Sequence, residues 1–327
     1  MTRLLKVELT RLLCRRAVLV LLAVALVAPV VTGVATALNT RPPSDSEVAR
    51  AERLAERDAE RPRTQRMFEK CMDDPERHLG RAAGDVEAAC EEAYLPQPEW
   101  YVYWESLDLV AERQEGSGVV LLVVLGIAMM LAGATFAGHD WASGSVSNQL
   151  LFEPRRVRVW VAKAVAVTAV PFAVVVVVMT AYWLFLGWLA RSRDIAVPEG
   201  LLLDCLQAGW RGAAVVAAIA LGGYALTMLF RSTVAALGIL LALGIAGGMI
   251  LAVIGIGSIW NPGLNALAVV LDGATYWETA PCGPESPGST CEVERTLSLE
   301  RGSAFTGVLL AVALAASVWS FRRRDVG

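Results

Sequence analysis

Six uncharged apolar blocks divide this sequence of 327 residues. They cover residues 17–38, 118–138, 163–189, 213–230, 233–259 and 303–321. Each block is about twenty residues long, which is the length that a helix needs to cross roughly 30 Å of hydrocarbon. Lys163, at the start of the third block, is their only ionisable side chain. Because lipid offers backbone polar groups no partner outside the segment, such blocks form helices. We therefore expect an all-α polytopic membrane protein with six transmembrane helices.

A buried helix of a large soluble protein is the alternative explanation for any single block. Hydrophobic residues make up 55% of the chain, which is above the roughly 45–50% of soluble domains. The excess is concentrated in the six blocks, and too little polar sequence separates them to bury six such helices. The distribution of apolar residues therefore favours the membrane.

Basic side chains between the blocks predict the orientation. The segments 1–16, 139–163 and 322–327, together with Arg231, hold 13 Lys and Arg residues against 4 Asp and Glu residues. Short segments rich in Lys and Arg stay on the cytoplasmic side of a membrane. Both termini, including the tail 322–327, are therefore expected in the cytoplasm, and the outer segments are 39–117, 190–212 and 260–302. We expect a multi-pass protein of the cytoplasmic (plasma) membrane.

The segment 1–16 is predicted to form an amphipathic helix. Leucines recur at positions 5, 9 and 12, and charged residues fall between them. Basic residues beside an apolar stripe suit a helix that lies in the inner membrane interface. The alternative is that this segment is only the charged flank that orients the first span. A cleaved signal peptide is a further alternative, because Arg15 and Arg16 precede an apolar run that ends in Ala-Thr-Ala.

The outer segment 39–117 is the only one large enough for an extracytoplasmic subdomain. Residues 47–63 are rich in helix formers and run up to Pro62, which predicts a helix with a solvated charged face. Aromatic residues at 100–104 precede the second span and suit a helix at the membrane interface. In the last outer segment, residues 264–271 are too few to span, which predicts a re-entrant or interfacial helix.

Four of the six cysteines lie in predicted outer segments: Cys71, Cys90, Cys282 and Cys291. An even number of cysteines in an oxidising compartment predicts two local disulfides, although four cysteines allow three connectivities. The chain has only two histidines, and the spacing of its cysteines does not match a zinc site. We therefore predict no metal site.

The inner segment 139–162 is longer than a plain connection between two helices needs to be. It combines an acid, small residues, an apolar group and a basic cluster, namely Asp140, Ser143, Gly144, Ser145, Val146, Leu150, Leu151, Phe152, Pro154, Arg155 and Arg156. A short helix is expected to begin near the serines, capped by a hydroxyl, and to end before the proline. The arginines that follow would anchor the third span at the inner headgroups.

This short helix would present Val146, Leu150 and Leu151 on one side. An apolar knob held between two spans on the cytoplasmic side is suited to a protein partner. The alternative is an amphipathic linker that rests on the membrane, which the composition does not exclude.

The order of these residues resembles the permeases of the type-two ABC exporter family. The shared pattern is Asp140-x-x-Ser143-Gly144-Ser145, then leucines, then Pro154-Arg155-Arg156 and a lysine that opens the next span. Ser145 stands where the family more often has threonine. Further matches are Glu8-Leu9-x-Arg11, Leu229-Phe230-Arg231-Ser232-Thr233 and the basic cluster 322–324. The likeness covers all six spans. The first outer segment is longer than in compact members, so the resemblance implies no function for it.

The resemblance implies a transport subunit without its own nucleotide-binding site. In that family the permease pairs with a second permease, a copy or a paralogue, and with two cytoplasmic ABC ATPase subunits that bind ATP and Mg. The helix that carries Glu8 and Arg11 lies at the interface, Arg231 belongs to a short inner connection, and the segment 139–162 docks on the ATPase. Residues 146–152 would transmit ATP-driven closure to the spans. The sequence has no GxxxxGK[ST], so we expect no cofactor on this chain.

Three other functions are alternatives. An intramembrane enzyme or a secondary transporter would need ionisable residues or broken helices inside the spans, and apart from Lys163 at an entry point the predicted spans hold no ionisable residue. We therefore expect no catalytic residues. A sensor or scaffold whose first outer segment binds a ligand or partner is the main alternative, and it is compatible with export. Uncharged spans favour an amphipathic or lipid-like substrate over a charged solute, and nucleic acid is not an expected partner.

Overall fold

A computed structural model of the protein describes residues 1–80, 85–102, 104–242, 247, 249, 258–281 and 290–323. The chain forms two compact units. Met1–Val34 and Asp108–Gly327 make up the first, which we call the bundle unit. Ala35–Leu107 make up the second, which we call the insert unit because its sequence interrupts that of the bundle unit.

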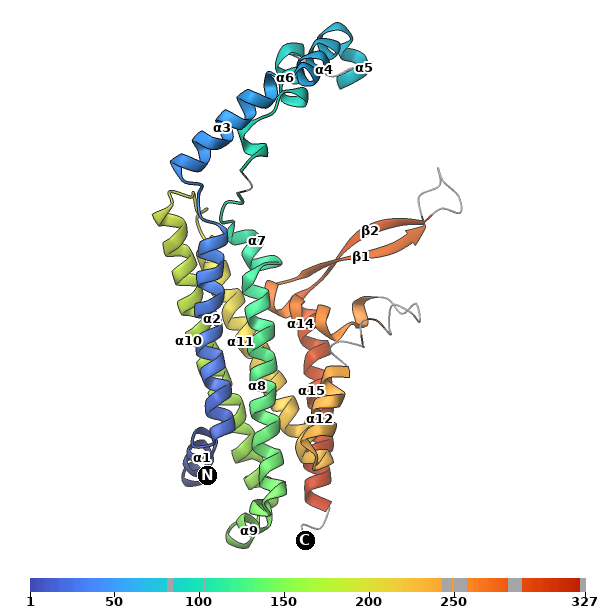
Figure 1. Cartoon of the computed structure of the whole chain (residues 1–327). Coiled ribbons are helices and arrows are strands. Elements are labelled where there is room, and N and C mark those ends of the chain that lie inside the picture. The colour runs from blue at the N-terminus through green and yellow to red at the C-terminus, as the bar shows by residue number, and fades with distance from the viewer. Residues whose placement is uncertain are drawn as a thin grey trace. The chain divides into compact units, whose positions relative to one another are not determined.

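Five helices among the described residues are long and apolar enough to cross a membrane, which fits a multi-pass membrane protein (Figure 1). They are α2 (Arg16–Asn39), α8 (Ser117–Ala142) with the short α7 (Leu109–Gln114) before it, α10 (Arg156–Ser192), α11 (Leu201–Phe230) and α15 (Leu299–Arg323). Each covers one predicted block. Of the remaining predicted span, 233–259, the structure describes α12 (Thr233–Leu241), and residues 243–246, 248 and 250–257 lie outside the described residues.

Helix α11 packs against α8, α10 and α15 and forms the centre of the bundle unit. Glycine lets the backbones of α8 and α11 approach closely, because a Cβ added at Gly133 would lie 2.3 Å from the carbonyl oxygen of Ala220. In the most apolar stretch of the span formed by α7 and α8, 56% of the residues are buried, and the share is the same in α11. In the corresponding stretches of α2 and α15, only 17% of the residues are buried. The apolar side chains of α2 and α15 are therefore available to lipid or to another protein.

The short helices α1 (Thr2–Leu13) and α9 (Ser145–Phe152) lie at the end of the bundle unit where α10 begins and α15 ends (Figure 1). We call this the α9 end. Helix α1 packs against α10, and Trp141 near the end of α8 makes an edge-to-face contact with Phe321 of α15. The predicted amphipathic segment is a helix, in which Leu12 is buried and Leu5 and Leu9 are half-buried.

Short helices build the insert unit: α3 (Asp45–Ala59), α4 (Pro62–Asp73), α5 (Pro75–Leu79), α6 (Val86–Tyr94) and the 3-10 turn η1 (Pro98–Trp100). Ser44 and Glu47 form a capping box at the start of α3. Pro62 occupies the first turn of α4, where a missing N–H costs no helical hydrogen bond. A disulfide between Cys71 and Cys90 joins α4 to α6. The insert unit is therefore held by local helix signals and one covalent link.

The aromatic run 100–104 is not the interfacial helix that its position predicts. Turn η1 ends at Trp100, and the Tyr101 hydroxyl donates to Asp58 Oδ2 of α3 at 2.9 Å. The indole N–H of Trp104 donates to the carbonyl of Thr40 at 3.4 Å. Within the insert unit, these long-range hydrogen bonds hold Tyr101 against α3 and Trp104 against Thr40, and neither residue lies in an α-helix. Residue 103 lies outside the described residues.

The connection between α12 and α15 contains strands that an all-α prediction misses. The 3-10 turn η3 (Ser258–Trp260) is followed by α14 (Pro262–Leu271), the helix predicted at 264–271, which Asn261 caps with its side-chain oxygen. An antiparallel hairpin of β1 (Ala274–Pro281) and β2 (Thr290–Leu297) comes next. Ala274 pairs with Leu297, and both pack on Ala268 of α14. The Thr-Tyr-Trp run at 275–277 favours a strand and was the available signal.

Candidate functional site

The connection between α8 and α10 carries α9. Gly144 turns the chain with a φ of 66°, and α9 begins at Ser145. Pro154 follows the helix, and α10 begins at Arg156 rather than at Lys163, where the third span was predicted to start. The connection between the two long helices is therefore shorter than the predicted segment 139–162.

The predicted hydroxyl cap of α9 is wrong. The N-cap is Gly144 in the left-handed region, which glycine adopts without a Cβ clash. The Ser143 hydroxyl donates to the carbonyl of His139 at 2.8 Å. The Ser145 hydroxyl accepts from Arg11 Nη2 at 2.5 Å. One serine thus supports the end of α8, and the other ties α9 to α1.

The apolar side chains of α9 divide between a buried end and an exposed end. Val146 is 1% exposed, and Leu150 is half-buried. Leu151 is 80% exposed and Phe152 is 91% exposed. The prediction that Val146 shares an outward face with Leu150 and Leu151 is therefore wrong, because Val146 anchors the helix. We call Leu151 and Phe152 the α9 tip.

Next to α9, five ionisable side chains form a largely buried ion cluster: four come from α1, α8 and α10, and Arg15 comes from the connection between α1 and α2. Lys163 Nζ of α10 lies 2.8 Å from Glu8 Oε2 of α1 and 2.5 Å from Asp140 Oδ2 of α8, and all three side chains are at most 1% exposed. Arg11 Nη2 lies 3.0 Å from Asp140 Oδ1. Arg15 contacts the same carboxylate oxygen. We call these five residues the ion cluster.

The ion cluster supplies the counter-charges that Lys163 requires. An ammonium group away from water is costly, and within a membrane-spanning helix it needs anionic partners. Glu8 and Asp140 provide two carboxylates. The ring of Phe136 lies 4.7 Å from Arg15 Cζ and 5.1 Å from Lys163 Nζ, which adds cation–π attraction. Because the members share partners, removal of one unbalances the others.

Two polar side chains of α9 connect this helix to the ion cluster. Arg11 donates to Ser145 Oγ, and through Nη1 it donates to Gln149 Oε1 at 3.3 Å. Gln149 in turn donates to Glu8 Oε1. One network therefore joins α1, α8, α9 and α10. Helix α9 is therefore linked, through Arg11 and Glu8, to charged groups on both long helices that flank it.

Sequence reasoning finds part of this network. The structure brings together four residues that separate motifs single out, namely Glu8, Arg11, Asp140 and Ser145. It adds Gln149, and it gives Lys163 a buried role and Arg15 a partly buried one in place of a position at the membrane flank. Lys163 was the sequence feature that could have predicted the ion cluster, because an ionisable side chain in an apolar block needs carboxylates from neighbouring inner segments.

Three further predicted residues lie at the α9 end. Arg231 ends α11 with a φ of 55°, and its Cζ lies 4.5 Å from the ring centroid of Trp141. Arg156 Nη1 donates to the carbonyl of Phe321 at 3.4 Å, which links the start of α10 to the end of α15. Arg155 is exposed at the start of α10. The α9 end therefore carries basic side chains beyond those of the ion cluster.

The predicted outer cysteines take part in disulfides where the structure describes them. Cys71 is bonded to Cys90, and Cys291 is also disulfide-bonded. Cys282 lies outside the described residues. In the part of the chain that the structure describes, no group of three or more His, Cys, Asp or Glu residues could hold a metal ion.

The motifs that resemble type-two ABC exporter permeases meet at the α9 end. Glu8 and Arg11 contact Lys163 and Asp140 in the ion cluster, and Ser145 binds Arg11. Function is therefore inferred from this geometry, since no family model, curated protein or solved structure matches the chain.

Proposed function

We propose that the chain is the transmembrane permease subunit of an ATP-binding-cassette exporter, with the α9 tip as the contact for a cytoplasmic ATPase. The observation that carries the proposal is that the end of α9 is exposed while other side chains of the same helix are bound to the ion cluster. Leu151 and Phe152 are 80% and 91% exposed, while Gln149 and Ser145 of the same helix bind the ion cluster. The excess of Lys and Arg in the short segments near this end favours its location in the cytoplasm.

The α9 tip has the chemistry of a docking anchor. Large apolar side chains gain about 25 cal/mol for each Å² that a partner removes from water, and helices dock into grooves through a few such anchors. The alternative is a linker that inserts Leu151 and Phe152 into lipid. Helix α9 lies beyond the end of α8 rather than alongside the long helices (Figure 1), which favours a soluble partner.

The ion cluster would transmit movement from the ATPase to the long helices. When ATP-driven closure displaces the tip, Gln149 and Arg11 would act on Glu8 and Asp140, and Lys163 would carry the movement into α10. The sequence contains no GxxxxGK[ST], so ATP and Mg would bind to the partner. Two ATPase subunits and a second permease, a copy or a paralogue, would complete the exporter. The exposed apolar surface of α2 offers area for that second permease.

An amphipathic or lipid-like substrate fits the long helices best. Helix α10 has no charged side chain from residue 164 to residue 190, and α15 has none from 302 to 321. A strongly charged solute would find no counter-charge along these stretches, and an uncompensated charge at membrane depth is costly. The apolar part of a lipid-like molecule would meet chemically similar side chains.

Co-purification with a candidate ABC ATPase that is co-expressed with this chain tests the proposal. Leu151→Asp/Phe152→Asp should weaken association by about 30-fold or more, because loss of an interface hot spot costs about 2 kcal/mol or more. Stimulation of the ATPase by the permease should fall in parallel. Val234→Asp is the matched control, because Val234 is 82% exposed at the start of α12 and is not part of the tip.

The result that would contradict the proposal is a wild-type chain that captures no ATPase, or a tip variant that binds and stimulates as well as the wild type. Equal loss in Val234→Asp would also contradict it, because the effect would then not belong to the tip. Both tip side chains are exposed, so the free energy of unfolding should change by less than about 0.5 kcal/mol. Circular dichroism checks this for each variant.

A membrane-anchored sensor or scaffold is the second candidate function. It is favoured by the insert unit, which is compact, contains a disulfide and carries Trp100 with 60% of its surface exposed. Exposed tryptophan is a frequent anchor in binding sites. In this case a photoreactive residue at the exposed position 99 would capture a ligand or partner, and the additional change Trp100→Ser would abolish the capture without changing ATPase association.

A further inference from the structure

Helix α15 is buried near its two ends and is half-buried or exposed between them. Its buried residues are Gly302 near the start and Ser317, Ser320 and Phe321 near the end. Near the start, a Cβ added to Gly302 would lie 2.6 Å from the carbonyl oxygen of Asn265 in α14, so these two helices approach closely. Helix α15 is therefore held at two separate places, and the contacts near its end determine how closely that end follows the rest of the bundle unit.

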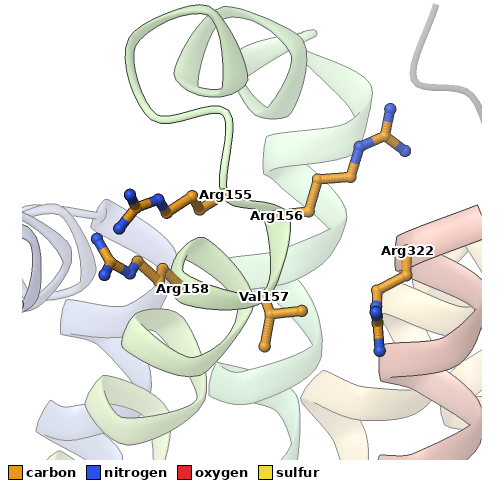
Figure 2. Close-up of a pocket in the computed structure, with 5 residues that line it drawn as sticks. All are labelled: Arg155, Arg156, Val157, Arg158 and Arg322. Atoms are coloured by element: carbon orange, nitrogen blue, oxygen red, sulfur yellow. The ribbon is translucent and has the colours of Figure 1, made fainter.

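The start of α10 lies beside the end of α15, but most of its basic side chains do not join the two helices. Arg155 and Arg158 point away from Arg322 of α15, on the other side of the α10 backbone (Figure 2). Arg156 Nη1 donates to the carbonyl of Phe321 at 3.4 Å, which is longer than a typical N–H···O distance of about 3.0 Å. The arginines therefore give the end of α15 only a weak attachment to α10.

One turn further along α10, Trp160 makes a shorter and enclosed hydrogen bond to α15. Its indole N–H donates to Ser317 Oγ at 3.1 Å, and the two residues are 5% and 0% exposed. A buried indole does not always find such an acceptor, because the buried Nε1 atoms of Trp141 and Trp183 have no hydrogen-bond partner among the described residues. The hydroxyl opposite Trp160 is therefore a specific feature of α15.

Trp160 is also fixed to α11 and lies close to the ion cluster. The hydroxyl of the buried Tyr224 in α11 donates to the carbonyl of Trp160 at 3.0 Å, and the two ring centroids are 5.4 Å apart. Lys163 lies three residues after Trp160 and therefore on the same face of α10. Its ammonium group contacts Glu8 and Asp140. The part of α10 that the ion cluster holds thus meets both α11 and α15 at Trp160.

We propose that Trp160 is a positioning residue that transmits movement of α10 to the end of α15 through its hydrogen bond to Ser317. This rests on the proposed function, in which an ATPase acts on α9 and, through the ion cluster, on α10. Away from water, an indole N–H that loses its acceptor is costly, so a displaced α10 draws Ser317 with it. Because α15 is not buried along its middle, its end can shift without unpacking a large core.

The alternative is that Trp160 and Ser317 serve packing alone. A large aromatic ring stabilises a helix bundle by burial, apart from any hydrogen bond of its N–H group. Trp160→Phe keeps an aromatic ring and removes the donor, and Ser317→Ala removes the acceptor. Ser317→Thr keeps a hydroxyl at the same position. These variants separate the hydrogen bond from the packing of the ring.

ATPase stimulation by the full chain in nanodiscs tests the hydrogen bond. Trp160→Phe and Ser317→Ala should each lower the stimulation of a candidate ABC ATPase by about threefold or more, the usual effect of one hydrogen bond between membrane helices on an equilibrium. The double variant should lower it no further, whereas independent effects would multiply to about ninefold. Ser317→Thr should retain most of the stimulation. All variants should bind the ATPase as the wild type does, because the α9 tip is unchanged.

A fluorescent label near the end of α15 tests the movement itself. Cys14→Ser removes an exposed free cysteine, and Cys205 is buried and stays. An environment-sensitive label on Arg322→Cys should change its emission when ATP is added to the complex, and Trp160→Phe should reduce that change by at least about threefold. The same label on Asn148→Cys, an exposed position of α9, should respond equally with and without Trp160→Phe, because docking precedes the step at Trp160.

The outcomes distinguish failure of this proposal from failure of the exporter proposal. Equal stimulation by the wild type, Trp160→Phe and Ser317→Ala would overturn the role of Trp160 and leave the exporter proposal standing. Multiplied effects in the double variant, or an undiminished response at position 322 in Trp160→Phe, would do the same. A wild type that neither stimulates an ATPase nor responds at position 148 would contradict the exporter proposal, and the role of Trp160 with it. If Trp160→Phe does not fold, Ser317→Ala decides alone, because it leaves the ring in place.

Discussion

In the bundle unit, Lys163 lies within 2.8 Å of Glu8 and Asp140, and the three side chains are at most 1% exposed. In the insert unit, Arg61 lies 3.0 Å from Asp58, but these side chains are 59% and 19% exposed. The distances are similar, and each contact joins a basic side chain to a carboxylate. The buried cations and carboxylates depend on each other because water does not solvate them, whereas the exposed pair exchanges readily with water and contributes little.

The comparison also concerns what holds each unit together. Several helices of the bundle unit meet at the ion cluster, and α9 is attached to it through Gln149 and Ser145. The insert unit instead has a disulfide between Cys71 and Cys90 and hydrogen bonds at its surface. A change of one charge should therefore damage the bundle unit most, and loss of the disulfide should damage the insert unit most.

The largest effect is expected from Lys163→Met. This change leaves Glu8 and Asp140 buried without their shared ammonium group, and removal of one partner from a buried ion pair costs about 3–5 kcal/mol. The free energy of unfolding in mixed detergent micelles should fall by that amount. Lys6→Met is the control, because Lys6 is exposed on α1 and should change the stability by less than about 0.5 kcal/mol.

A second variant tests whether the ion cluster acts as a unit. Glu8→Gln/Lys163→Met removes one carboxylate together with the ammonium group, so it should restore part of the stability that Lys163→Met loses. A Lys163→Met protein as stable as the Lys6→Met control would break the comparison, because the buried charges would then matter no more than exposed ones.

Removal of the disulfide should have the next largest effect, confined to the insert unit. The two cysteines are 19 residues apart in the sequence, and a loop of this size is worth about 3 kcal/mol when it is closed. Cys71→Ser/Cys90→Ser should therefore speed amide hydrogen exchange in α4 and α6. Exchange in α8 and α10 should stay as in the wild type. Faster exchange throughout both units would show that they do not unfold separately.

Loss of Gln149 should have a smaller effect on stability and a specific effect on coupling. Gln149→Ala removes hydrogen bonds to Arg11 and Glu8, and a hydrogen bond to a charged group contributes about 2 kcal/mol. Within the exporter proposal, the variant should still bind the ATPase through the α9 tip but stimulate it less. Asn148→Ala is the matched control, because Asn148 is exposed on the same helix. Full stimulation by Gln149→Ala would exclude the network as the route of coupling.

The parts of the fold that the sequence predicts depend on local patterns. The long apolar helices, the helix that stops before Pro62 and the short helix before Pro154 each follow from composition or from a terminating residue. The contacts of Glu8 with Lys163 and of Tyr101 with Asp58 join segments that are far apart in the sequence. Such pairs depend on tertiary packing, so the ion cluster and the non-helical aromatic segment could not be read from periodicity.

The charged helices α1 and α3 also show that a local sequence pattern does not predict tertiary contacts. Both carry acidic and basic residues at helical spacing. The prediction of a solvated charged face holds for α3, in which Arg57 is 64% exposed, but Glu8 on α1 is buried. The difference comes from what each helix packs against, namely α10 for α1. Only the lysine in a neighbouring apolar block indicated that α1 needed a different interpretation.

The smallest effect concerns the exposed pair of the insert unit and is visible mainly in its pH dependence. The hydrogen bond from Tyr101 and the nearby Arg61 lower the pKa of Asp58 from its ordinary value of 3.8. Because the folded unit holds this proton less tightly than the unfolded chain, the stabilisation is complete above pH 3.8 and is lost as the pH falls through the lowered pKa. Burial and the same hydrogen bond raise the pKa of Tyr101 from 10.0, so its contribution is lost at high pH.

Asp58→Asn should therefore remove the stabilisation that the wild type loses between pH 3.8 and the lowered pKa, while it leaves the bundle unit unchanged. Protection factors from amide hydrogen exchange in α3, corrected for the intrinsic rate at each pH, measure this directly. Asp45→Asn is the control, because Asp45 lies in the first turn of the same helix and is exposed. If Asp58→Asn also speeded amide hydrogen exchange in α8 and α10, the exposed pair would be coupled to the buried cluster, and the contrast between the two sets of charges would not hold.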